Sequence, residues 1–283
     1  MRLFFTELRR FSARRAVRWL VVVALLVIAL GTLIAAINSK EKTVQHFVTV
    51  CPGVGPQQTT PLECTAPGTF VQDNRFHLHD QLGDAIGGTG VAMLLLGVLF
   101  GTTFIGADYA GGALPGQLTF EPRRTYMYAT KAVVVAVATA VLTIFLLLVL
   151  SAALAGVAQW RGVVGHLDAS WYVHRLADIG RVAAVCGGTA AIGFAVTTLA
   201  RRSVAAVVGF LALGFIVEPA LTAALNLFDG KTPMFNLVAV AINDFRDAPE
   251  GITSLAKSTA VAGIWTAGLL LLGGTVFARR EVR

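Results

Sequence analysis

The sequence predicts an all-α integral membrane protein with six transmembrane helices in one domain, residues 1–283. The chain is 55% hydrophobic and 14% charged, with a mean hydropathy of +0.71, whereas soluble domains are about 25% charged. Its apolar residues form continuous runs of about the 20 residues that a helix needs to cross a bilayer. These runs do not alternate with period two, as barrel strands do. They cover residues 19–37, 85–107, 132–158, 182–200, 204–228 and 258–278.

Residues 1–18, ahead of the first run, are basic and carry apolar side chains at helical spacing. As a helix, their apolar face holds Phe4, Leu8 and Phe11 with Phe5 at its edge, and the opposite face holds Glu7, Arg10 and Arg14. This pattern predicts an amphipathic helix lying in the membrane interface. A basic start that only sets the topology explains the segment equally well.

The first run is longer than the apolar core of a cleaved signal peptide, about 7–15 residues, so we expect a retained span. Orientation follows from the lysines and arginines beside the spans. With the N-terminus inside, the short inner segments collect most of the 23 basic residues. We therefore expect a multi-pass protein of the plasma membrane with both termini cytoplasmic. This topology also explains the net charge of +7 without any binding to nucleic acid.

Residues 38–84 are predicted to form a long extracellular loop, which contains Cys51 and Cys64. An oxidising compartment would let these two cysteines form a disulfide that staples a loop with little core of its own. The proline, glycine, glutamine and threonine between them argue against regular structure. Cys186 falls inside the fourth run and is expected to be a small buried apolar residue.

The sequence predicts neither a metal site nor a catalytic site. His77, His79 and Asp80 lack a second ligand cluster, so solvated loop histidines are the better interpretation. Residues 229–232 (Asp-Gly-Lys-Thr) end like a phosphate-binding loop, but Leu225 stands where that motif requires glycine. We expect no enzymatic activity from this chain by itself.

The later spans carry two further features. Arg201 and Arg202 alone join the fourth and fifth runs, which predicts a tight hairpin, and residues 234–242 are too short to cross, which predicts a short extracellular helix. Glu218 lies inside the fifth run and precedes Pro219, which kinks helices. A carboxylate within a membrane is a functional candidate, here on a substrate path, although a hydrogen-bonded carboxyl at a helix contact fits equally.

Residues 106–131, between the second and third runs, read GADYAGGALPGQLTFEPRRTYMYATK. Asp108 closes the second span, glycines and a proline interrupt the chain after it, and Lys131 opens the third span. Apolar and charged residues alternate in between, at Leu114, Leu118, Glu121, Pro122, Arg123 and Arg124. The segment favours a short helix along the cytoplasmic membrane surface, suited to docking a protein.

This segment resembles the region between the second and third spans of type-2 permeases of ATP-binding-cassette (ABC) exporters, in particular actinobacterial members. The matching positions are Asp108, Gly112-Ala113-Leu114, Leu118-Thr119, Pro122-Arg123-Arg124 and Lys131. Members of the family commonly have glutamate where this chain has Asp108. The six-span layout and the basic amphipathic start extend the resemblance along the chain.

The resemblance implies that the segment is a coupling helix, which docks on a separate cytoplasmic ATPase and transmits its ATP-driven closure to the spans. Two ATPase subunits, holding ATP and magnesium, would work with two permease chains, identical or homologous, to move an apolar or amphipathic substrate outward. The residues implied for coupling are Asp108, Leu114, Leu118, Glu121, Pro122, Arg123, Arg124 and Lys131.

Two other functions stay open. A secondary transporter or channel would use Glu218 and need no ATPase. A non-transporting immunity or sensor subunit would depend on the extracellular loop instead. Only the first of these alternatives predicts that a conservative change at Glu218 abolishes activity.

Overall fold

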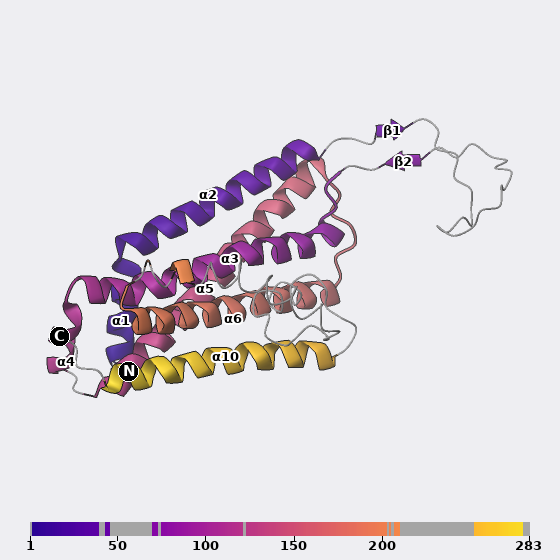
Figure 1. The fold of residues 1–283 in the computed structure, drawn as a ribbon. Helices are drawn as coiled ribbons and strands as arrows, with labels where there is room; N and C mark the ends of the chain where they lie inside the picture. Colours follow the sequence, from indigo (N-terminus) through magenta and orange to yellow (C-terminus); the bar gives the residue numbers. More distant parts are fainter. Residues whose placement is uncertain are drawn as a thin grey trace.

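The computed structural model describes residues 2–39, 43–45, 70–72, 75–120, 123–202, 204, 207–209 and 252–279 (Figure 1). These residues are almost entirely helical. In chain order the elements are α1 (Arg2–Ala13), α2 (Arg15–Asn38), β1 (Thr43–Gln45), β2 (Phe70–Gln72), α3 (Leu78–Ala110), α4 (Ala113–Phe120), α5 (Arg124–Arg161), α6 (Ala169–Ala200) and α10 (Ile252–Arg279).

Four helices, α2, α3, α5 and α6, are long and apolar enough to cross a membrane, which agrees with a multi-pass membrane protein. They contain the first four predicted spans, and each exceeds its predicted bounds. The 38 residues of α5 extend about 57 Å, well beyond a hydrocarbon core of about 30 Å. The sixth predicted span, 258–278, falls within α10. Most of the fifth, 204–228, lies outside the described residues, as does the predicted helix at 234–242, so the count of six stays a prediction.

The long helices run side by side, so that each end of the bundle collects particular termini (Figure 1). One end, called the α1 end, holds α1, α4, the start of α5 and the end of α10. The opposite end, called the β1–β2 end, holds the start of α3, the end of α5 and the strand pair. The positive-inside rule predicts that the α1 end is cytoplasmic.

The helix α3 begins at Leu78, seven residues before the predicted span, and this corrects the loop boundary at residue 84. Leu78, Leu82 and Ile86 are buried at successive i, i+4 positions, so one face of this added stretch belongs to the core. The polar residues between them occupy the outer face. Local polarity therefore hid a helix that packing supports.

Backbone hydrogen bonds tie together the chain segments at the β1–β2 end. The Leu78 amide donates to the Val163 carbonyl at 2.9 Å, and the Val163 amide donates to the Phe76 carbonyl at 2.8 Å. The Ser39 hydroxyl donates to the Arg161 carbonyl at 3.0 Å and accepts from the Phe76 amide at 3.0 Å. The ends of α2 and α5 are thereby fixed to the start of α3.

Two short strands follow α2 and precede α3. β1 and β2 pair antiparallel, with Thr43 opposite Gln72 and Gln45 opposite Phe70. The predicted loop thus contains a small piece of regular structure outside its proline-rich part. Cys51 and Cys64 lie outside the described residues, so their disulfide stays a prediction.

The helices α3 and α6 pack closely because glycines line their contact. A Cβ added at Gly97 would lie 2.7 Å from the Cys186 carbonyl oxygen, and one added at Gly193 would lie 2.7 Å from that of Val98. A Cβ at Gly101 would overlap the Ala190 carbonyl. Small residues at such a contact let helix backbones approach within a membrane, where packing drives association.

Candidate functional site

The most unusual feature of the described residues is a cluster of charged side chains buried at the α1 end. It consists of Glu7 from α1, Arg14 from the break between α1 and α2, Asp108 from the end of α3, and Lys131 from α5. We call these four residues the buried charge cluster. Two carboxylates and two cations balance its formal charge.

Lys131 is the centre of the cluster and has a side chain only 1% exposed. Its ammonium group donates to Asp108 Oδ2 at 2.7 Å and to Glu7 Oε2 at 3.1 Å. The ammonium nitrogen also lies 5.3 Å from the centre of the Phe104 ring. One lysine thus joins α5 to both α1 and α3.

Arg14 closes the other side of the cluster. Its guanidinium donates to Asp108 Oδ1 at 2.6 Å and to the carbonyls of Thr103, at 3.2 Å, and Phe104. It also covers the Phe104 ring at 4.6 Å from the centroid. Because Arg14 has an extended backbone that separates α1 from α2, the same residue breaks the helix and fixes the break against α3.

The cluster is stable only as a complete set. Removing charged groups from water costs several kcal/mol per ion, and mutual attraction offsets this cost only when every group is paired. Both oxygens of Asp108 are paired, and Glu7 accepts from Lys131 through one oxygen and from Arg10, at 3.3 Å, through the other. Loss of one member would leave an uncompensated buried charge.

Aromatic side chains surround the cluster and exclude water from it. Phe11 of α1 lies against Phe100 and Phe104 of α3, with ring centroids 5.8 and 5.7 Å apart. Tyr128, one turn before Lys131, contacts the rings of Phe194 and Phe277. Apolar packing and the ion pairs therefore join α1, α3, α5, α6 and α10 at one level.

The cluster lies on both flanks of α4, the helix expected to dock a partner. The chain leaves α3 just after Asp108, turns at Gly112 with φ of 61°, forms α4, and enters α5 seven residues before Lys131. A positive φ favours glycine because it has no Cβ. The ion pair between Asp108 and Lys131 therefore closes the base of the loop that presents α4.

The structure divides the predicted coupling residues into two groups. Asp108 and Lys131 are buried in the cluster, whereas Arg123 is exposed at the N-cap of α5 and Arg124 begins that helix. The backbone of α4 includes Leu114 and Leu118, but their side chains fall outside the description, as do residues 121 and 122 (Glu121 and Pro122).

The helical-wheel prediction for Glu7 and Arg14 was wrong. It placed both on the polar face of α1, directed away from Phe11, whereas Glu7 is buried beside Phe11 and Arg14 turns inward to α3. The wheel assumes that a charge seeks water, and here each charge has a buried counter-ion. A lysine at the start of an apolar run, with acids elsewhere at the same membrane level, was the available signal.

The remaining predicted sites contribute little to this region. Glu218 and Pro219 lie outside the described residues. Cys186 is buried in α6, as expected. His79 and Asp80 pair with each other at 2.8 Å, and within the described ranges no three metal-ligating side chains come together.

Comparisons with known proteins find no protein-family model that matches the chain and no curated protein that matches it.

Proposed function

We propose that the chain is the membrane-spanning permease subunit of an ABC exporter, driven by a separate cytoplasmic ATPase that holds ATP and magnesium. In this proposal α4 is the coupling helix, and two such chains, or this chain and a homologue, enclose the substrate path. The substrate moves outward and is apolar or amphipathic. The motif around α4 and the helical multi-pass architecture support this function.

The buried charge cluster is the observation that carries the proposal. A docking helix is useful only if its displacement reaches the spans. Asp108 and Lys131 join the two helices that flank α4, and Glu7 and Arg14 extend this junction to α1 and the start of α2. A push on α4 therefore moves α3 and α5 together, with α1 following, instead of bending a loose loop.

Exposed arginines beside α4 suit a protein contact. Arg123 is exposed at the N-cap of α5, directly after the α4 segment. A charged residue at the rim of an interface contributes mainly to association rate and orientation, whereas the buried cluster holds the geometry behind it. Docking and transmission are thus assigned to different residues.

The test is the double variant Arg123→Glu, Arg124→Glu of the tagged chain, purified in mild detergent from its native membrane. We expect the wild type to bring down an ABC ATPase in stoichiometric amount, identified by mass spectrometry, and the variant to lose it. Arg201→Glu, Arg202→Glu is the matched control, because these arginines are exposed and belong to the end of α6 rather than to α4. The control should retain the ATPase.

Two results would contradict the proposal. An intact wild-type protein that brings down no ATPase removes the energy source, and the secondary transporter that uses Glu218 becomes the better function. Equal loss of the ATPase in the control would show a general effect of negative charge at this membrane surface rather than docking at α4.

A further inference from the structure

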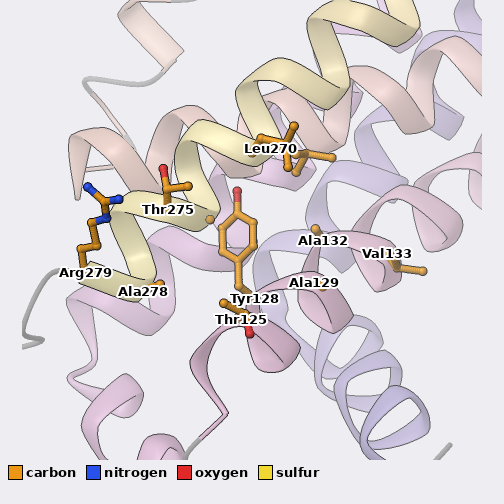
Figure 2. Close-up of a pocket in the computed structure, with 11 residues that line it drawn as sticks. Thr125, Tyr128, Ala129, Ala132, Val133, Leu270, Thr275, Ala278 and Arg279 are labelled. Atoms are coloured by element: carbon orange, nitrogen blue, oxygen red, sulfur yellow. The ribbon is translucent and has the colours of Figure 1, made fainter.

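An open apolar groove of about 460 Å³ lies between the start of α5 and the end of α10, at the α1 end (Figure 2). Its volume is within the range of small-molecule sites, about 300–1,000 Å³. The α5 wall holds Thr125, Tyr128, Ala129, Ala132 and Val133, and the α10 wall holds Leu270, Leu271, Gly274, Thr275, Ala278 and Arg279. The buried charge cluster contributes no residue to these walls.

Small residues make the groove. Ala129 and Ala132 on α5 lie opposite Gly274 and Ala278 on α10, so both helices lack side chains that would fill the space (Figure 2). Tyr128 packs against Gly274, where an added Cβ would lie 3.3 Å from its ring. The result is a narrow apolar trough along two helices.

The groove opens toward the surface that faces lipid. Val133 and Leu271, on its two walls, are 52% and 70% exposed, which a membrane-spanning helix tolerates only against hydrocarbon. An occupant therefore arrives from the bilayer and has an apolar chain.

One end of the groove is cationic. Arg279, in the last turn of α10, lines it and is exposed, and no described acidic group lies within ion-pair distance of its guanidinium. Thr125 supplies a hydroxyl on the opposite wall, next to the start of α5. Basic pockets between transmembrane helices at the cytoplasmic side bind anionic lipid headgroups.

From this charge complementarity we propose that the groove binds an anionic phospholipid of the leaflet at the α1 end. An acyl chain lies between the small residues of α5 and α10, and the phosphate contacts Arg279 and the Thr125 hydroxyl. The site does not involve α4 and is independent of the proposed ATPase. It would fix α10 against α5 at the level where the buried charge cluster fixes α1 and α3.

The test measures binding of dioleoylphosphatidylglycerol to the full-length, delipidated protein by native mass spectrometry, with dioleoylphosphatidylcholine as the uncharged-headgroup comparison. Arg279→Gln should weaken binding of the anionic lipid about fivefold, the effect of one cation near a headgroup. Ala129→Trp should weaken binding of either lipid about tenfold, because it displaces roughly two methylene contacts. Both positions are exposed, so the fold should survive.

Matched controls use residues outside the groove. Arg9→Gln removes one exposed arginine at the same end, on α1, and Val137→Trp adds the same bulk to the exposed face of α5 beyond the groove. Both controls should bind phosphatidylglycerol like the wild type. A phosphatidylglycerol with a photoreactive acyl chain should label peptides of α5 and α10, and Ala129→Trp should prevent this labelling.

Three results would overturn the proposal. The first is wild-type affinity in both groove variants, and the second is equal affinity of the wild type for the two lipids. The third is a disulfide between Ala129→Cys and a cysteine introduced into residues 204–228, which would show that the chain itself fills the groove. The pull-down of the ATPase reads the proposed function separately, so either proposal can fail alone.

Discussion

The two ends of the helical bundle use charge in opposite ways. At the α1 end, ion pairs join residues up to 124 positions apart, between side chains that are 1–18% exposed. At the β1–β2 end, the pairs are local. Asp178 pairs with Arg175 at 3.1 Å and with Arg181 at 3.4 Å, all on α6 and partly exposed. The first set connects helices, whereas the second only decorates one.

Apolar contacts and backbone hydrogen bonds hold the β1–β2 end together instead. Leu78, Leu82 and Trp171 are buried there, and the Trp171 indole donates to the His79 carbonyl at 3.2 Å. This end can be rebuilt by other apolar residues of similar volume. The α1 end cannot, because its buried charges require one another. The difference suits a protein that receives force at one end.

The largest expected effect is that of Lys131→Met, which removes the centre of the buried charge cluster. Asp108 and Glu7 then remain buried with fewer partners, and breaking such a set costs about 3–5 kcal/mol of the free energy of unfolding. Thermal unfolding followed by size-exclusion chromatography in detergent measures this loss. Arg181→Met is the matched control and should cost at most about 1 kcal/mol, because its pair is exposed and local.

A double variant sharpens this comparison. Glu7→Gln together with Lys131→Met should destabilise less than the sum of the two single changes, because the two groups share one interaction. Strict additivity, or a Lys131→Met protein as stable as Arg181→Met, would contradict the cluster as a connecting element.

An intermediate effect is expected from Gly101→Val, midway along α3. The new side chain would overlap the Ala190 carbonyl of α6, and overpacking of this kind costs about 1–3 kcal/mol. Gly156→Val on α5 is the control, because a Cβ there meets nothing within 4 Å. Equal melting temperatures for the two variants would show that the α3–α6 contact is not limited by its glycines.

The smallest expected effect concerns Asp168, the exposed N-cap of α6 at the β1–β2 end. Its carboxylate accepts from the Ser170 hydroxyl at 2.7 Å and from the Trp171 amide at 3.0 Å, and these bonds hold the pKa of Asp168 below its usual value. A lowered pKa in the folded state stabilises the protein above the ordinary pKa, and this stabilisation is lost as pH falls through the lowered one.

Asp168→Ala should therefore remove a small part of the acid sensitivity, seen as a flatter dependence of the unfolding midpoint between about pH 5 and pH 2. Ser170→Ala should give part of this effect, because one of the two hydrogen bonds remains. A steeper acid dependence in Asp168→Ala would contradict the assignment.

The candidate site was partly predictable. Asp108 and Lys131 stood out because they frame an interrupted segment between two apolar runs, and the structure brings them together at 2.7 Å. Glu7 and Arg14 were placed on the wrong face. A helical wheel records only the periodicity of one segment, and the counter-ions of these two residues lie on α5 and α3.

By itself, the sequence determined the helical class and four membrane-crossing helices, because an apolar run in lipid must satisfy its backbone hydrogen bonds internally. The glycines at Gly97 and Gly101, four residues apart, also carried a readable signal for close packing. Only the tertiary structure decided which charges are buried, where α3 begins and where α5 and α10 leave a groove. The physical reason is that burial of a charge or a helix face depends on partners distant in sequence.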